Sequence, residues 1–354
     1  MKGGEFIIKK SNPKDIFIPE DFSEESKLMA DSCKQFLDKE VIPNLEKIDQ
    51  QEEGLMASLL EKAGNLGLLA VTIPEEFGGL ALNFNASLLS SEKLGAGHSF
   101  SVAYSAHTGI GTMPILYYGT EEQRKKYIPK LASGELKGSY CLTEPSSGSD
   151  ANSGKTKAVL SKDGKNYILN GQKIWITNGG FADIFTVFAK IDNDENLSAF
   201  IVESKTKGIS LNPEEKKMGI KGSSTRQIFF DNVEIPVGNL LGERQGGFKI
   251  ALNILNAGRI KLGAGVLGAA KDTLSDAIVY ANERNQFGRP ISKYGAIRNK
   301  IADMCIKIWA LESAVYRCGN DIEVLMEENK KEIPDAYKAT FILLIIKFIF
   351  QTSL

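Results

Sequence analysis

The stretch SYCLTEPSSGSDANSG, residues 139–154, marks the point where the pattern of the chain changes. Before it, from Glu24 to about Gly138, apolar residues recur at three- and four-residue spacings, as they do in amphipathic helices. After it, as far as about Gly242, short runs of β-branched and aromatic residues predict strands. From Gly246 onward the helical spacing returns. The stretch therefore lies at the junction of a helical block and a β block.

The central block carries turn signals between its apolar runs. Asp163-Gly164 and Asn170-Gly171 are dipeptides that favour tight turns between strands. Several short strands with such punctuation predict a compact sheet or a small barrel. The order of the blocks predicts an α+β protein of several domains. The predicted parts are an N-terminal arm over 1–23, a helical domain over 24–139, a middle β-barrel or sheet domain over 140–242 and a C-terminal helical domain over 243–354.

The composition excludes several classes of function. The chain of 354 residues carries 43 Lys+Arg against 44 Asp+Glu, so its net charge gives no support for binding nucleic acid. Its four cysteines form no C-x-x-C pair, and only two histidines, His98 and His107, accompany them. We therefore predict no metal site and a reduced, cytoplasmic setting. The first residues show no targeting pattern.

The segment YKATFILLIIKFIFQTSL, residues 337–354, is strongly apolar and is interrupted by Lys347. It is too short to predict a membrane span, so we expect none. In a C-terminal position its apolar face would have no following segment to cover it.

Residues 263–268, GAGVLG, match the glycine pattern of dinucleotide-binding folds. That pattern functions where a strand precedes it and a helix opens at it, whereas here it lies inside a helical pattern that begins near Phe248. We therefore interpret these glycines as small residues that let another helix approach closely. The dinucleotide-binding interpretation is rejected.

Three interpretations compete for the stretch 139–154. It contains no G-x-S-x-G elbow, and the sequence places neither histidine to act as a base, so a serine hydrolase is rejected. An ordinary polar turn and a binding loop for a planar cofactor both remain open. The hydroxyl, glycine and aromatic residues that would serve such a cofactor are Thr143, Ser146, Ser147, Ser149, Gly148, Tyr140 and Trp175.

Four separated motifs give a further indication. They are TEPSSGSDA (143–151), WITNGG (175–180), MGIKGSSTRQIFFDNVEIP (218–236) and ERNQFGRPI (283–291). In this order they resemble the acyl-CoA dehydrogenase family, most closely its very-long-chain branch and similar long bacterial members. The resemblance runs from about Ile18 to Asp335. It implies the three-domain architecture already expected, with a C-terminal helical bundle that is incomplete in this sequence.

The resemblance implies FAD as the cofactor. Thr143 would hydrogen-bond the flavin ring, Trp175 would flank it, and Arg284 would reach an FAD phosphate across a subunit interface. Glu144 and Asp150 are interpreted as loop-shaping acceptors rather than catalysts. The residues implied for FAD are Tyr140, Leu142, Thr143, Gly148, Ser149, Trp175, Ile176, Thr177 and Arg284. Those implied for the substrate are Ser149 and Arg259.

The activity implied by the resemblance is FAD-dependent α,β-dehydrogenation of a fatty acyl-CoA to the trans-2-enoyl-CoA. Electrons would pass to an electron-transfer flavoprotein, and the chain would form a homodimer or homotetramer. One branch of the family carries its glutamate base at the position of Gly258, and the other carries it in a C-terminal segment. The base is therefore expected beyond Leu354, the sequence resembles a C-terminally truncated member, and we expect weak turnover or none. The alternatives are a non-catalytic assembly protein that binds flavin or acyl-CoA, and an acyl-CoA oxidase.

Overall fold

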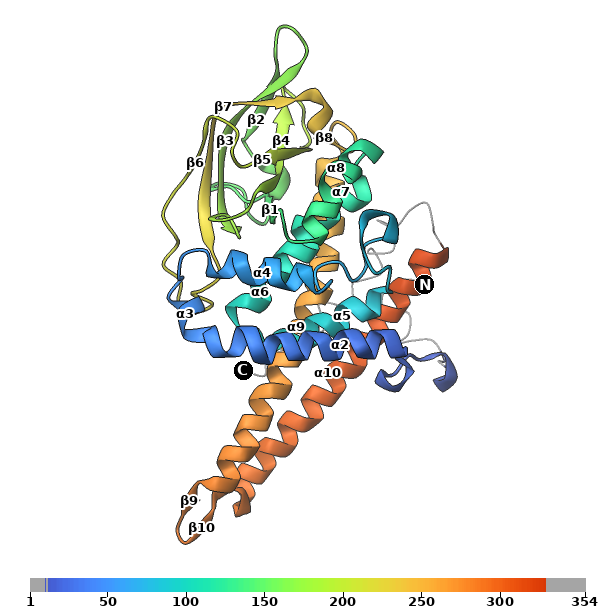
Figure 1. The fold of residues 1–354 in the computed structure, drawn as a ribbon, viewed down its shortest axis with the longest axis vertical. Helices are drawn as coiled ribbons and strands as arrows, with labels where there is room; N and C mark the ends of the chain where they lie inside the picture. Colours follow the sequence, from blue (N-terminus) through green and yellow to red (C-terminus); the bar gives the residue numbers. More distant parts are fainter. Residues whose placement is uncertain (1–9, 11, 329–354) are drawn as a thin grey trace.

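The structure is a computed structural model that describes residues 10 and 12–328. Helices fill the first part of the chain, as predicted (Figure 1). The Ser23 hydroxyl accepts from the Ser26 amide ahead of the first long helix, and Thr120 and Gln123 form a reciprocal capping box. The helices of this part are α2 (Glu24–Phe36), α3 (Leu45–Asp49), α4 (Leu55–Asn65), α5 (Phe84–Lys93), α6 (Ser99–Ser105), α7 (Met113–Tyr118) and α8 (Glu121–Ala132).

The middle part forms a sheet, which confirms the α+β class. Within the described residues it has eight strands in the order β6-β7-β3-β2-β4-β5-β8, with β1 parallel to β4. Phe185, Phe200 and Ile228 are among the apolar side chains that are fully buried in its core. The strands are β1 (Gly138–Cys141), β2 (Lys157–Leu160), β3 (Asn166–Thr177), β4 (Ile184–Ile191), β5 (Ser198–Glu203), β6 (Ile209–Leu211), β7 (Thr225–Pro236) and β8 (Leu240–Leu241).

One of the two predicted turns is wrong. Gly164 has φ +70° in a tight turn between β2 and β3, as its sequence predicts. Asn170 and Gly171, in contrast, lie inside β3, where the pairing with β7 shifts register between Leu169 and Gly171. A Cβ atom on Gly171 would lie 2.5 Å from Oγ1 of Thr156, so the glycine is needed for close approach of β2 rather than for a turn.

Helix α9 (Gly247–Glu283) runs from the sheet past the N-terminal helices (Figure 1). The GAGVLG stretch lies within it and lets neighbours approach closely, as predicted. A Cβ atom on Gly268 would lie 1.8 Å from the Glu92 carbonyl oxygen, and one on Gly95 would lie 2.2 Å from that of Gly265. Real Cβ atoms do not approach so closely, so glycine is required at both positions for α9 to pack on α5 and the turn after it.

Beyond the N-terminal helices, α9 and α10 (Gly295–Glu328) form a long hairpin. Its tip is a small ribbon of β9 (Asn285–Gln286) and β10 (Arg289–Pro290), at the end of the molecule opposite the sheet (Figure 1). The second helix begins at Gly295, after a 3₁₀ turn formed by Ile291–Lys293. The apolar segment 337–354 lies outside the described residues.

Helix α9 is also the one helix in the described part of the chain that is long and apolar enough to cross a membrane. Length and composition alone support that possibility, and 56% of the relevant window is buried inside the protein. The core helix of a folded domain has the same properties, so this finding is weak support for a membrane span.

Candidate functional site

The stretch 139–154 begins where β1 packs on the N-terminal helices. A Cβ atom on Gly138 would lie 2.8 Å from the Gly111 carbonyl oxygen, so the two backbones touch. The Gly138 amide donates to Nδ1 of His107 (3.0 Å), so Nε2 of His107 donates to the Leu131 carbonyl (2.9 Å). Burial lowers the pKa of His107 to about 4, which keeps the ring neutral. His107 therefore anchors β1 and offers no general base, as expected.

Beyond this anchor two segments lie side by side. We call them together the wall: the loop 142–150 and residues 173–177 of β3. The Ile174 amide donates to the Thr143 carbonyl at 2.9 Å, which joins the two segments directly. The wall thus unites two motifs, TEPSSGSDA and WITNGG, that are separated in sequence by β2 and its turn.

A buried ion pair lies within the wall. The side chains of Lys173 and Glu144 are 0% and 4% exposed, and Nζ lies 2.7 Å from Oε1. The same ammonium donates to the Leu142 carbonyl at 3.0 Å. The carboxylate also accepts from the amides of Lys155 (2.6 Å) and Thr156 (3.1 Å). Glu144 is therefore a loop-shaping acceptor, as its position in the loop suggested.

Burial and charge oppose each other in this pair. Burial pushes the pKa of Glu144 upward, but the Lys173 charge and the donors around the carboxylate outweigh it, so the pKa lies below its usual value. Burial lowers the pKa of Lys173, and the Glu144 charge opposes that change. A carboxylate held in this way is a poor proton acceptor, so Glu144 is not a candidate base.

Trp175 has an unusual backbone within β3. Its pairing with β7 shifts register between Lys173 and Ile176, and Trp175 in this bulge has φ +61°. Such left-handed geometry is rare for an aromatic residue, costs on the order of 1–3 kcal/mol and clusters at functional sites. The Trp175 side chain is 59% exposed, whereas Ile176 is buried. The main-chain carbonyl of half-buried Thr177 accepts from the Ser139 hydroxyl at 2.5 Å.

Several polar groups of the loop remain available. Among the described residues, neither the hydroxyl of half-buried Thr143 nor that of exposed Ser149 forms a hydrogen bond. A Cβ atom on Gly148 would meet nothing within 4 Å, so space beside its backbone is open. The Ser147 hydroxyl donates to the Asp150 carbonyl at 2.8 Å, so Asp150 shapes the turn through its main chain rather than its carboxylate.

The structure buries the ring of Tyr140, which the sequence suggested as a flat surface for a cofactor. Its ring is buried in the core against Phe188, with ring centroids 4.9 Å apart, and its hydroxyl donates to the Ala251 carbonyl at 3.1 Å. Leu142 and Ile176 are buried as well. The assignment of these three residues to a cofactor therefore stays a prediction that concerns their main chain alone.

Arg259 lies on α9 close to the start of the wall. Burial raises the pKa of the Tyr140 phenol, and the nearby Arg259 charge opposes that rise. The guanidinium is exposed and donates to Oδ1 of Asn256 at 2.6 Å, and within the described residues it forms no ion pair between helices. Next to it, a Cβ atom on Gly258 would lie 3.3 Å from Cγ2 of Ile110, which is already tight.

The structure does not bring Arg284 to the wall of its own chain. Its amide donates to the Tyr280 carbonyl at 2.9 Å as the C-terminal cap of α9, at the tip of the hairpin (Figure 1). The Tyr140–Ala251 bond places the wall near the other end of α9. That helix has 37 residues and is about 55 Å long, which no arginine side chain spans.

Sequence reasoning missed Lys173. In the strand NYILNGQKIWIT, a lysine between polar and apolar residues looks like a solvent-facing side chain. The one available signal is the two-residue alternation of a strand, which puts Lys173 and Ile174 on opposite faces of the sheet. The bulge between Lys173 and Ile176 then interrupts this alternation. Its partner Glu144 was recognised as structural, but the sequence does not show which cation meets it.

Profiles of one family match all three parts of the chain. The acyl-CoA dehydrogenase N-terminal domain matches residues 23–135, the middle domain residues 139–233 and the C-terminal domain residues 245–335. The chain is similar to a probable acyl-CoA dehydrogenase of Bacillus subtilis (strain 168), with 49% identity over 317 residues, 90% of this chain and 53% of the relative. It is 42% identical over 302 residues to an acyl-CoA dehydrogenase of the same organism, 84% of this chain and 79% of that protein.

The fold is similar to that of a solved acyl-CoA dehydrogenase from Bacillus anthracis complexed with FAD. The TM-score is 0.92 at 46% identity, over 96% of this chain and 58% of that one. The chain belongs to the acyl-CoA dehydrogenase family, a family of oxidoreductases. Mammalian very-long-chain enzymes are among its relatives, which confirms the resemblance found in the sequence. The chain spans about half the length of several curated relatives that it matches.

Proposed function

We propose that this chain is the FAD-binding part of an acyl-CoA dehydrogenase for long fatty acyl chains. The reaction converts a fatty acyl-CoA to the trans-2-enoyl-CoA, and the electrons pass to an electron-transfer flavoprotein. Family membership and the relatives named for very-long-chain substrates support the substrate class. The observation that carries the proposal is the exposed, left-handed Trp175 beside the open groups of the loop.

The residues of the wall fit a flat cofactor with polar edges. The indole of Trp175 offers a face on which a ring stacks, and such a contact explains why its backbone strain is maintained. The Thr143 hydroxyl offers a donor, Gly148 leaves space for close approach, and exposed Ser149 would face the acyl-CoA together with Arg259. When bound, FAD supplies the acceptor for the hydride that leaves the β carbon.

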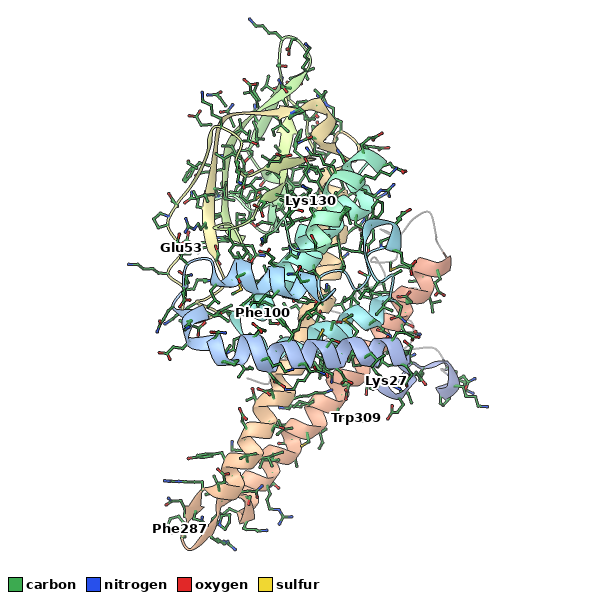
Figure 2. The ribbon with its side chains drawn as sticks, viewed as in Figure 1. Lys27, Glu53, Phe100, Lys130, Phe287 and Trp309 are labelled. Atoms are coloured by element: carbon green, nitrogen blue, oxygen red, sulfur yellow. The ribbon has the colours of Figure 1, made fainter. Side chains whose placement is uncertain are left out.

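A second copy of the chain completes the site in this proposal. Arg284 lies too far from the wall of its own chain, so its guanidinium would serve the FAD of a neighbouring copy. The hairpin that carries it exposes large apolar side chains: Phe287 at the tip is 94% exposed and Trp309 on α10 is 70% exposed (Figure 2). Exposure on this scale favours a homodimer or homotetramer in which the hairpin is covered.

No general base is proposed among the described residues of the wall. Glu144 is held by Lys173, and Gly258 has no side chain. Removal of the α proton needs a carboxylate within reach of the substrate. We therefore propose that the wall binds flavin and acyl-CoA, and we assign no base to its described residues.

The cytoplasm is the proposed location. All four cysteines are free, and Cys33, Cys141 and Cys318 are buried, which suits a reducing compartment. The bacterial relatives agree with this proposal.

Titration of the purified chain with FAD tests the proposal. We expect saturable binding that Gly148→Val abolishes, because the new side chain fills the space beside the loop. Gly238→Val is the matched control, since a Cβ atom there also meets nothing within 4 Å but lies outside the wall. Absence of FAD binding, or equal binding by both variants, would contradict the proposal.

Anaerobic absorbance of the FAD-loaded chain with a long acyl-CoA tests whether the substrate binds beside the flavin. We expect the added acyl-CoA to shift the flavin spectrum. An unchanged flavin spectrum at saturating acyl-CoA would contradict the proposed substrate site.

A further inference from the structure

The Lys173–Glu144 pair has no part in the proposed chemistry, yet it connects every segment that meets at the wall. The ammonium binds the Leu142 carbonyl and the Glu144 carboxylate, which lie on either side of Thr143 in the loop. The carboxylate in turn accepts from the main chain at Lys155 and Thr156, just before β2. Loop, β2 and β3 are thus fixed to one buried pair of charges.

The pair is also linked to Trp175 along β3. Lys173 lies two residues before it in β3, on the N-terminal side of the bulge, and the intervening Ile174 amide donates to the Thr143 carbonyl. Movement of Lys173 would therefore shift both the loop that carries Thr143 and the strand that carries Trp175. Because both charges are buried, water does not compete for these contacts, and the geometry is held more firmly than by an exposed pair.

We propose that Lys173 and Glu144 are a positioning pair: they hold Thr143 and Trp175 in one arrangement before FAD arrives, and so set its affinity and surroundings. The inference rests on the proposed binding of FAD at the wall. Neither side chain is assigned a contact with cofactor or substrate. The gain would be preorganisation, because a loop already fixed in the bound arrangement loses little entropy on binding.

An apolar pair of similar size separates positioning from mere stability. Buried ion pairs are often replaced by well-packed apolar residues without loss of stability. Methionine and leucine fill the space of Lys173 and Glu144, but neither donates to the Leu142 carbonyl nor accepts from the Thr156 amide. The double variant Lys173→Met/Glu144→Leu is therefore expected to fold and to lose the fixed arrangement of the wall.

The chain offers a direct probe of that arrangement. It contains two tryptophans, Trp175 and Trp309, so a Trp309→Phe parent leaves Trp175 as the only one. In this parent, acrylamide quenching of Trp175 emission reports its surroundings without FAD, and flavin fluorescence reports FAD affinity. Circular dichroism at the same temperature shows that each variant is folded.

In the double variant we expect altered Trp175 quenching without FAD and an FAD Kd raised about tenfold or more. Lys126→Met is the matched control, because it breaks the exposed Lys126–Glu203 pair (2.9 Å) in α8 and β5. That control is expected to leave both measurements unchanged.

A folded double variant with the parent's Trp175 quenching and FAD affinity would overturn the inference. If the double variant does not fold, Glu144→Gln replaces it, and unchanged quenching and affinity in that variant overturn the inference equally. If the parent itself binds no FAD, the proposed function fails. Quenching of Trp175 in the variants then decides alone whether the pair positions the wall.

Discussion

Two lysines are buried in this chain in opposite ways. Lys173 in the wall meets the Glu144 carboxylate and a main-chain carbonyl. Lys261 on α9 donates to the Thr108 hydroxyl (3.0 Å) in the π-helical segment η7 (Ala106–Gly111), and within the described residues no acid pairs with it. Burial alone lowers the pKa of Lys261 to about 8, whereas at Lys173 a counter-charge opposes the same effect.

The contrast is between a buried charge with a counter-charge at the candidate site, Lys173, and a buried charge without one, Lys261. Around Lys173 three segments converge, and each contributes an acceptor or a donor to the same pair. Around Lys261 there is a cavity of about 10 Å³, room for roughly one water molecule, between α9 and the N-terminal helices. The same side chain therefore stabilises one region and is expected to destabilise the other.

The largest effect is expected from breaking the pair at Lys173. Lys173→Met leaves the Glu144 carboxylate buried without its cation, which commonly costs about 3–5 kcal/mol of folding free energy. Urea denaturation followed by circular dichroism measures that loss. The double variant Lys173→Met/Glu144→Leu should recover most of it, and the double-mutant cycle then gives the coupling between the two side chains. If Lys173→Met lowers the free energy of unfolding no more than the loss of an exposed lysine does, the Lys173–Glu144 pair does not stabilise the wall.

A gain of stability is expected at Lys261. Its pKa of about 8 in the folded state, against 10.5 for an unburied lysine, means that protonated Lys261 costs on the order of 3 kcal/mol below pH 8. Lys261→Met removes this cost, so the variant should be more stable than the parent at pH 7. The gain is reduced by the lost bond to Thr108.

The pH dependence sharpens the test. Between pH 8 and 10.5 the unfolded chain binds more protons at Lys261 than the folded chain, so the parent gains stability as pH rises through this window. The difference between Lys261→Met and the parent should therefore shrink from pH 7 to pH 10, while other groups titrate alike in both. A difference that stays constant across this range would show that Lys261 is not buried as a charge.

The fold was more predictable from the sequence than the contacts that hold the site. Spacing of apolar residues distinguishes helix from strand over long windows, so the switch near Gly138 and the return to helix near Gly246 were visible. The glycines of GAGVLG were correctly interpreted as packing residues, because they lie inside a helical pattern and no strand precedes them. Asn170-Gly171 was misjudged because a local turn signal cannot anticipate that Thr156, just before β2, needs the same space.

Contacts between distant segments explain the errors at the site. Tyr140 was expected to offer its ring to a planar cofactor, but the ring is buried and its hydroxyl donates to the Ala251 carbonyl on α9. Trp175 was expected near a planar cofactor, and the structure exposes it through a bulge that no local sequence signal reveals. Thr143 and Ser149 remain predictions, because free hydroxyls permit a role without demonstrating it. The resemblance to a family supplied those assignments; the physical pattern alone left an ordinary turn open.

The smallest effect is expected where a lysine is paired at the surface. Lys126 in α8 lies 2.9 Å from Glu203 in β5, and the Tyr127 hydroxyl donates to the same carboxylate oxygen at 3.0 Å. The side chains of Lys126 and Glu203 are 59% and 50% exposed. Lys126→Met should therefore change the folding free energy by less than about 1 kcal/mol. The Tyr127 bond keeps Glu203 partly satisfied after the lysine is lost. Repeating the urea denaturation at high salt should reduce even this difference, since exposed pairs are screened and the buried Lys173 pair is not. If Lys126→Met lowers the free energy of unfolding as much as Lys173→Met does, burial does not determine how much these ion pairs contribute to stability.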